Sequence, residues 1–214
     1  MSSPIPRVVR AEHAFAATVS SSLPPPTLVE FAFAGRSNVG KSSLLNTLVE
    51  RKNLVRTGST PGTTRQINFF LTQLADGFEA YLVDLPGYGY AKRSKSEKAA
   101  WGELIEAYLL SRPTLRSVVL LVDVRRGIEP DDQQLIDFLD REPTIPRPKV
   151  PVVVVATKLD KLSPSAQKPA VARIARESGL RVIGFSSVTG EGRDLLWRTL
   201  RRHALGDARP TAET

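Results

Sequence analysis

The chain has 214 residues, of which 41% are hydrophobic, and a formal net charge of +8 that comes from 30 Lys and Arg against 22 Asp and Glu. This length suits one domain with a sizeable core, and the lack of cysteine excludes disulfides, thiolate metal ligands and a cysteine nucleophile, which fits a reducing compartment. Because no apolar run approaches the about 20 residues that span a bilayer and no secretory signal pattern is present, we expect a cytoplasmic protein without a membrane span.

Proline and serine are frequent before the first strong apolar run, most clearly at residues 20–26. Such residues disfavour regular packed structure. We therefore predict a flexible N-terminal extension over residues 1–27, a folded domain over residues 28–205 and a C-terminal tail over residues 206–214.

The chain is organised around a glycine-bounded loop between a predicted strand, near residues 28–34, and a predicted helix. The loop reads Gly35-Arg36-Ser37-Asn38-Val39-Gly40-Lys41-Ser42-Ser43. Loops of this kind bind polyphosphate because their backbone N–H groups and the positive end of the following helix converge on one anionic site. Lys41 would reach the β- and γ-phosphates, and the Ser42 hydroxyl would coordinate Mg²⁺. The complete spacing in this context makes a chance glycine-rich turn the weaker explanation.

A long polar connection follows at residues 53–66, and a loop of this length in a compact domain is usually functional. It contains Pro61-Gly62-Thr63-Thr64. A threonine here can supply a hydroxyl to Mg²⁺ and a backbone N–H to a γ-phosphate, so loss of that phosphate would release the loop. Plain turn chemistry is the alternative explanation for these residues.

Two strand-like runs, at residues 67–74 and 78–83, are joined through Asp76-Gly77, which predicts a tight hairpin and an antiparallel edge strand. The second run leads into Asp84-Leu85-Pro86-Gly87. A carboxylate at position 84 can orient the ligand shell of Mg²⁺, often through water, and Gly87 can bring a backbone N–H to the γ-phosphate. Without the glycine-bounded loop, an ordinary strand-end turn would be the preferred explanation.

The rest of the chain alternates between helical and strand patterns. Continuous apolar runs at residues 118–123 and 152–156 are typical of central parallel strands. Helices are predicted from about residue 96, around residues 135–139, at 165–178 and from 192, with a last strand at 181–185. We predict a doubly wound α/β fold with a mostly parallel six-stranded sheet and one antiparallel edge strand. Ligands of such sheets bind at the carboxyl ends of the strands, where each motif falls.

A base-recognition motif follows the fifth predicted strand, at Thr157-Lys158-Leu159-Asp160. A carboxylate at Asp160 accepts hydrogen bonds from the ring N–H and exocyclic amine of guanine, whereas adenine offers a lone pair and no amine there. Leaving these acceptors unpaired makes the binding free energy of adenine less favourable than that of guanine by a few kcal/mol. Lys158 can lay its aliphatic stem along the base, and backbone groups at Ser186-Ser187-Val188 can meet the guanine carbonyl. Taken alone, Lys158 and Asp160 would be read as surface charge.

With these motifs in this order, residues 31–200 resemble a translation-factor-class GTPase and, more narrowly, the EngB family (also called YihA or YsxC), whose members act in ribosome biogenesis. The resemblance implies a P-loop GTPase G domain with GTP and GDP as substrate and product and Mg²⁺ held by Ser42, Thr64 and Asp84. The family's motif spacing selects Thr64 over Thr63. Thr157 replaces the asparagine usual in the wider superfamily, as is common in this family. The resemblance is carried by 33–44, 51–54, 59–62, 67–70 and the highly specific 83–91.

The residue after Gly87 is Tyr88, where Ras-like enzymes place a glutamine that orients the attacking water. We therefore expect slow unaided hydrolysis, with the transition state stabilised by Lys41, Mg²⁺ and backbone donors that include Thr64 and Gly87. A ribosomal partner or a K⁺ ion near Asn38 would complete the site.

The leading functional hypothesis is a monomeric, GTP-dependent switch that docks on the large ribosomal subunit or its precursor, through rRNA and ribosomal protein. The basic stretch 92–98 and the arginines Arg198, Arg201 and Arg202 are candidate contacts, and a positive net charge favours such an anionic partner. A solvated basic face explains the charge equally well. The main alternative is a non-catalytic GTP/GDP-dependent interaction module, for example in cell division and septation. An ATP-using enzyme is disfavoured by Asp160.

Overall fold

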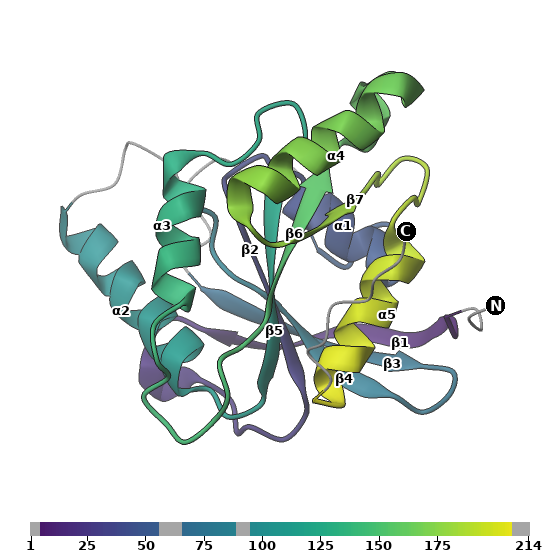
Figure 1. Cartoon of the computed structure of the whole chain (residues 1–214). Helices are drawn as coiled ribbons and strands as arrows, with labels where there is room; N and C mark the ends of the chain where they lie inside the picture. The colour runs from purple at the N-terminus through teal and green to yellow at the C-terminus, as the bar shows by residue number, and fades with distance from the viewer. Residues whose placement is uncertain (1–4, 56–65, 89–94, 207–214) are drawn as a thin grey trace.

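The computed structural model describes residues 5–55, 66–88 and 95–206, and for residues 95–101 only the backbone (Figure 1). These residues form one seven-stranded sheet in the order β1-β3-β4-β2-β5-β6-β7. Strand β3 pairs antiparallel with both β1 and β4, and the other neighbouring strands are parallel. The strands are β1 Val8–Ala17, β2 Glu30–Gly35, β3 Ile67–Leu74, β4 Glu79–Asp84, β5 Leu115–Asp123, β6 Val152–Thr157 and β7 Arg181–Gly184.

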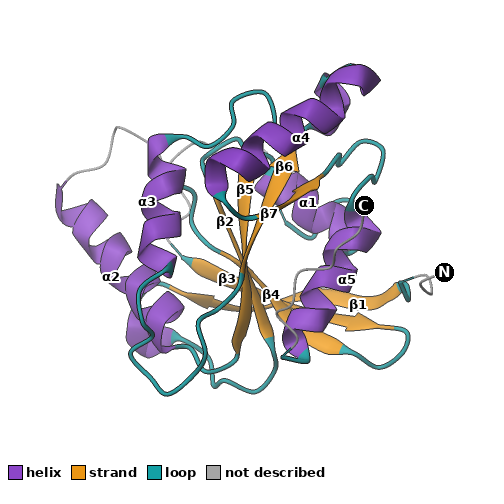
Figure 2. Cartoon of the chain, viewed as in Figure 1, coloured by secondary structure: helices purple, strands orange, loops and turns teal. Residues whose placement is uncertain are grey.

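Five α-helices in the described part of the chain cover both faces of the sheet (Figure 2). Their bounds are α1 Lys41–Leu48, α2 Lys95–Ser111, α3 Pro130–Leu139, α4 Pro164–Ser178 and α5 Arg193–Ala204. Helices α1 and α5 pack on one face, and α2, α3 and α4 pack on the other. The doubly wound α/β fold predicted from the sequence is therefore confirmed.

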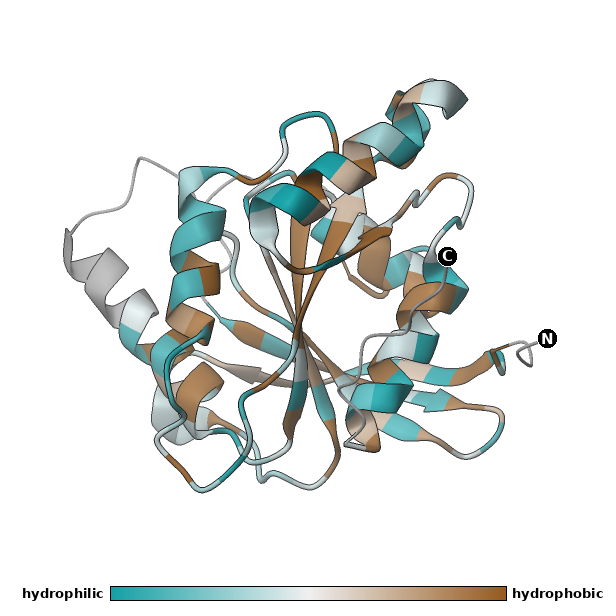
Figure 3. Cartoon of the chain, viewed as in Figure 1, coloured by the Kyte–Doolittle hydropathy of each residue, from teal (hydrophilic) through white to brown (hydrophobic). Residues whose placement is uncertain are grey.

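Side-chain alternation along β2 explains why two layers of helices are needed. Phe31 and Phe33 point into the core beside α1 and α5, whereas Ala32 and Ala34 point into the core beside α2. The central strands are apolar on both faces, as their brown colour in Figure 3 shows. A sheet of this kind is stable only when both faces are covered.

The prediction of six strands with one antiparallel edge strand is wrong in number, because residues 8–17 of the supposed flexible extension form β1. Strand β1 lies at the sheet edge and pairs with β3, with Val8 and Ala17 buried at its ends. Its middle is mostly exposed, so it lacks the alternation that marks a half-buried strand. Residues 207–214 of the predicted tail lie outside the described residues.

The hairpin predicted through Asp76-Gly77 is confirmed. Strands β3 and β4 pair in register from Asn68 opposite Asp84 to Gln73 opposite Glu79. Gly77 has φ +85°, which glycine adopts without steric strain. The hairpin brings Asp84, the last residue of β4, to the carboxyl end of its neighbour β2.

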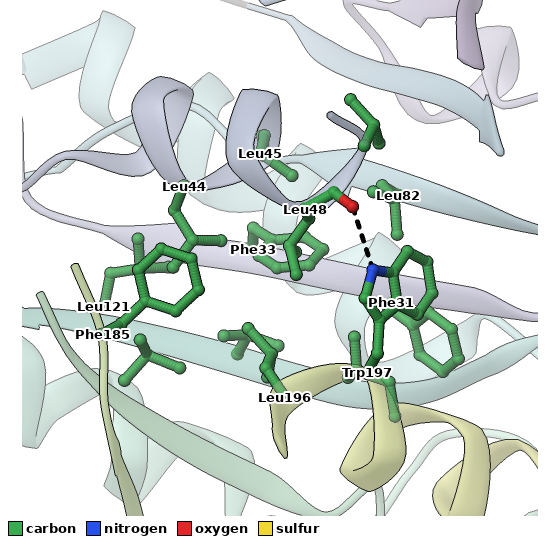
Figure 4. Close-up of a cluster of buried hydrophobic side chains, with 14 of the residues drawn as sticks. Phe31, Phe33, Leu44, Leu45, Leu48, Leu82, Leu121, Phe185, Leu196 and Trp197 are labelled. Atoms are coloured by element: carbon green, nitrogen blue, oxygen red, sulfur yellow. Dashed lines mark hydrogen bonds between the residues drawn. The ribbon is translucent and has the colours of Figure 1, made fainter. Parts of the chain in front are cut away.

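Trp197 of α5 is the largest fully buried side chain of the described residues (Figure 4). Its indole N–H donates to the Leu48 carbonyl oxygen at 3.0 Å, at the end of α1. A carbonyl in the last turn of a helix has no partner within that helix. Trp197 therefore both fills the core and satisfies the end of α1.

Replacing Trp197 with Phe is expected to lower the free energy of unfolding by about 1–3 kcal/mol, because it removes this hydrogen bond and leaves a void. Urea denaturation measures the change. Leu205→Ala is the matched control, since Leu205 is 85% exposed just after the same helix and should change stability by less than about 0.5 kcal/mol. Equal stability of the Trp197→Phe and unmodified proteins would contradict this account of the α1–α5 contact.

Candidate functional site

The glycine-bounded loop is a tight turn between β2 and α1. Gly40 has a left-handed backbone with φ +103° and precedes α1, whose start has no side-chain cap. A Cβ on Gly35 would lie 2.9 Å from Val39 Cγ1 and 3.0 Å from the Leu121 carbonyl oxygen, so that position also requires glycine. The uncapped first turn of α1 leaves backbone N–H groups for an anion.

Lys41 begins α1 and forms an ion pair with Asp84 at the end of β4. Their side chains are only 12% and 8% exposed, so each charge depends on a partner. The Asp84 carboxylate and the neighbouring Ser42 hydroxyl supply hard oxygen ligands, which suit Mg²⁺. Within residues 5–55, 66–88 and 95–206 no group of three or more His, Cys, Asp or Glu side chains could hold a metal, so Mg²⁺ here would need ligands from a bound phosphate and water.

Thr157, the last residue of β6, and Lys158, which follows it, hold the glycine-bounded loop in place. Thr157 Oγ1 lies 2.7 Å from the Val39 carbonyl oxygen and 3.0 Å from that of Val122, and it shares its proton between them. Lys158 Nζ donates to the Asn38 carbonyl oxygen at 2.8 Å. The loop after β6 and the loop after β2 are therefore joined directly, although they are about 120 residues apart in the chain.

Asp160 is oriented by a serine from the next strand end. Ser186 Oγ donates to Asp160 Oδ1 at 2.8 Å and accepts the backbone N–H groups of Val188 and Thr189, each at 3.2 Å. The Ser186 hydrogen bond is the main reason that the pKa of Asp160 lies below its usual range. Asp160 is therefore ionised at neutral pH and able to accept hydrogen bonds from a ligand.

Tyr88 connects the turn after β4 to both the glycine-bounded loop and α3. The Ser37 N–H donates to the Tyr88 carbonyl oxygen at 3.2 Å, and the Tyr88 N–H donates to the Gly35 carbonyl oxygen at 3.4 Å. The Tyr88 hydroxyl donates to Asp132 Oδ1 at 2.7 Å. Burial is the largest cause that raises the pKa of the Tyr88 hydroxyl and of the Asp132 carboxyl.

The structure brings the described motifs together at the carboxyl edge of the sheet. They are Gly35 to Ser43 from the end of β2, Asp84 to Gly87 from the end of β4, Thr157 to Asp160 from the end of β6 and Ser186 to Val188 after β7. The side chains of Val39, Leu85 and Leu159 are buried in the core, so only their backbone groups can reach a ligand. The predicted site residues Gly62, Thr63 and Thr64 lie outside the described residues.

Two contacts near the site were not predicted from the sequence. Arg36 binds Asp131 at 2.6 Å and Glu129 at 3.2 Å, both at the start of α3. Asp123 at the end of β5 binds Arg125, and this contact is the main cause that lowers the pKa of the Asp123 carboxyl. An Asp123 carboxylate oxygen also lies 3.1 Å from Lys158 Nζ. The acidic, proline-containing start of α3 is a recognisable helix signal, but its partner in the loop is distant in the sequence.

The fold and this arrangement of motifs define the class of P-loop GTPase G domains. Residues 30–158 match the family model described as 50S ribosome-binding GTPase. A probable GTP-binding protein EngB of Desulforapulum autotrophicum is 49% identical over 86% of this chain and 91% of its own length. One of the same name from Geobacter metallireducens is 46% identical over 89% of this chain and 90% of its own length.

The chain therefore belongs to the EngB family of GTPases, within the 50S ribosome-binding GTPase group. It is also similar to a solved structure titled as a probable GTP-binding protein EngB, with a TM-score of 0.62 over 83% of this chain and 100% of the other. At 23% identity, that likeness shows the shared fold. No helix in the described part of the chain is long and apolar enough to cross a membrane.

Proposed function

We propose that this GTPase binds GTP and GDP with Mg²⁺ at the carboxyl edge of its sheet and acts as a nucleotide-dependent switch on the large ribosomal subunit or its precursor. The observation that carries the proposal is the direct link between the glycine-bounded loop, here called the phosphate loop, and the loop that bears Asp160. Thr157 and Lys158 fix the position of the loop that would bind phosphate relative to the loop that would bind guanine. A site built in this way recognises the phosphates and the base of the same nucleotide.

The phosphate end of the site consists of backbone donors from Gly35 to Ser43 together with the Lys41 ammonium. Lys41 and Asp84 form an ion pair. In a nucleotide complex, a phosphate would replace Asp84 as the partner of Lys41, and Mg²⁺ would replace Lys41 as the partner of Asp84. In that complex the Lys41 ammonium would bind a phosphate oxygen, and Ser42, Thr64 and, through water, Asp84 would hold Mg²⁺. The metal supplies neutralisation of the negative charge on the β- and γ-phosphates.

The base end of the site depends on the ionised Asp160 carboxylate. Its Oδ1 already accepts from Ser186, which fixes its orientation toward a guanine edge. The stem of Lys158 covers one face of the base, and Val188, which is 77% exposed, is placed to contact it from the adjacent loop. Ser187 and Val188 supply backbone groups for the guanine carbonyl.

Hydrolysis by the protein alone is slow in this proposal. The Tyr88 side chain is held on α3 by its hydrogen bond to Asp132, and a buried phenol that keeps its proton is a poor base for an attacking water. Lys41 and the Gly87 and Thr64 N–H groups stabilise charge, but a group that orients water is missing from this set. A ribosomal component or a K⁺ ion beside the exposed Asn38 supplies the remaining stabilisation.

The family name and the net charge of +8 support a ribosomal partner. Among the α5 arginines predicted to contact rRNA, Arg201 is a weaker candidate than the sequence implies, because it already binds Asp76 at 2.5 Å. Arg193 at the start of the same helix binds Glu50 at 3.3 Å and Asp194 at 3.0 Å. The side chains of the basic stretch 92–98 lie outside the described residues and stay candidates.

The proposal is tested by calorimetric titration with GDP and ADP, followed by steady-state GTP turnover with and without large ribosomal subunits. GDP is expected to bind at least about 100-fold more tightly than ADP, since Asp160 opposes adenine. Turnover is expected to rise when large subunits are added or when K⁺ replaces Na⁺. Equal affinity for GDP and ADP would contradict the site, and turnover that responds to neither addition would contradict the proposed activation.

A further inference from the structure

The turn Asp84-Leu85-Pro86-Gly87 lies directly on the phosphate loop. Two backbone hydrogen bonds join Tyr88 to Ser37 and Gly35, and Arg36 and Tyr88 form an isolated parallel bridge. A Cβ on Gly87 would lie 3.1 Å from Ser37 Oγ and 3.4 Å from Ser37 N. The turn and the loop are therefore in van der Waals contact at the place where a γ-phosphate would have to fit between them.

Side chains from both partners of this bridge bind the same first turn of α3. From the turn, the Tyr88 hydroxyl donates to Asp132. From the loop, Arg36 forms its ion pairs with Asp131 and Glu129. We call these five residues, Arg36, Tyr88, Glu129, Asp131 and Asp132, the α3 clasp.

The acceptor for Tyr88 is held rigidly. Asp132 is 1% exposed, and while its Oδ1 accepts from Tyr88, its Oδ2 accepts the Glu129 N–H at 3.0 Å at the start of α3. Tyr88, Ile128 and Leu135 are also partly buried and pack against the same core cluster. The clasp thus fixes the turn through a side chain that is anchored in the helix and not in the ligand.

We propose that the α3 clasp holds the turn closed on the phosphate loop when no γ-phosphate is present, so that Tyr88 is a positioning residue that sets the preference of the site for GDP over GTP. The inference rests on the proposed nucleotide site. A γ-phosphate that binds the Gly87 N–H and the loop together has to displace the Tyr88 carbonyl from Ser37, whereas the β-phosphate of GDP lies deeper in the loop. The free energy needed to open the clasp therefore weakens GTP binding and leaves GDP binding unchanged.

The test is Tyr88→Phe, which keeps the ring and removes only the hydroxyl. Affinities for GDP and for a non-hydrolysable GTP analogue are measured by calorimetry. The ratio of GTP-analogue affinity to GDP affinity is expected to rise about 5- to 10-fold, with GDP affinity within about twofold of the unmodified protein. Arg36→Gln, which removes the other side of the clasp, is expected to shift the ratio in the same direction.

Tyr108→Phe is the matched control, because the Tyr108 hydroxyl likewise donates to a buried carboxylate, Glu30, at 2.9 Å. It should lower the melting temperature and leave the affinity ratio unchanged, which separates positioning from general stability. An unchanged or lower ratio in Tyr88→Phe would overturn the clasp while the nucleotide site stands. Failure of the unmodified protein to bind GDP would overturn the site itself, and the inference with it.

Discussion

Replacing Asp160 with Asn is expected to lower the affinity for GDP by about 10²–10³-fold and to raise the affinity for xanthosine diphosphate above that for GDP. The Asp160 carboxylate is acceptor-only, which matches the ring N–H and amine of guanine. Xanthine carries a carbonyl where guanine carries that amine, so it requires a donor, and the asparagine amide supplies one. The change keeps the shape of the side chain and replaces one of its two acceptor oxygens with an NH₂ donor.

Competition titrations with GDP, ADP and xanthosine diphosphate measure this exchange of specificity. Asp137→Asn is the matched control, since Asp137 is an exposed carboxylate on α3 away from the candidate site, and its replacement should leave all three affinities unchanged. If Asp160→Asn kept the original preference for GDP, the base would be read by other groups, and the role proposed for the loop after β6 would be wrong.

Replacing Glu30 with Ala is expected to lower the free energy of unfolding by about 3–5 kcal/mol, because it leaves the charge of Arg112 buried without its partner. Glu30 is fully buried at the start of β2, and Arg112 Nε lies 2.8 and 2.9 Å from its two carboxylate oxygens. Thr114 Oγ1 also donates to Glu30 at 2.7 Å. Arg112 in turn donates to the Pro24 carbonyl oxygen at 2.7 Å, so the network ties the connection after β1 to the sheet.

Chemical denaturation of three variants separates the buried charge from simple loss of packing. The double variant Glu30→Met with Arg112→Met should be markedly more stable than Glu30→Ala, because an apolar pair of similar volume leaves no unpaired charge. Glu103→Ala, at an exposed position of α2, is the matched control and should change stability by less than about 0.5 kcal/mol. A loss below about 1 kcal/mol in Glu30→Ala would contradict this account.

Because Glu30 is at the amino-terminal end of β2, GDP affinity at the carboxyl edge should be unchanged in the folded fraction.

The parts of the fold that could be predicted from the sequence are those with local signals. The phosphate loop is marked by glycine spacing, the β3–β4 hairpin by Asp76-Gly77, and the central strands by continuous β-branched runs. Strand β1 is not predicted because its paired residues in β3 are 50 (Ala17 to Ile67) to 66 (Val8 to Leu74) positions away and its own middle is exposed. The serine and proline residues at 20–26, which suggested a flexible extension, belong to the connection between β1 and β2 and not to β1 itself.

The candidate site shows the same division between local and long-range information. Motif residues from Gly35 to Val188 were identified from their place after each strand, which the parallel topology converts into one shared edge. The contacts that join them were not predictable, because Thr157 reaches Val39 and Arg36 reaches Asp131 across about 118 and 95 positions. Such pairings depend on how the strands are ordered in the sheet, which no single motif encodes.

Co-sedimentation with purified large ribosomal subunits, in the GTP-analogue, GDP and nucleotide-free states, tests the central claim most directly. The account predicts that the protein pellets with large subunits in the GTP-analogue state and is largely released in the other two, because the γ-phosphate would hold the loop with Thr64 and the turn from Asp84 to Gly87 in place. Asp160→Asn should regain this behaviour only with the xanthosine triphosphate analogue. Equal binding in all three states, or binding in none of them, would contradict a nucleotide-dependent switch on the ribosome.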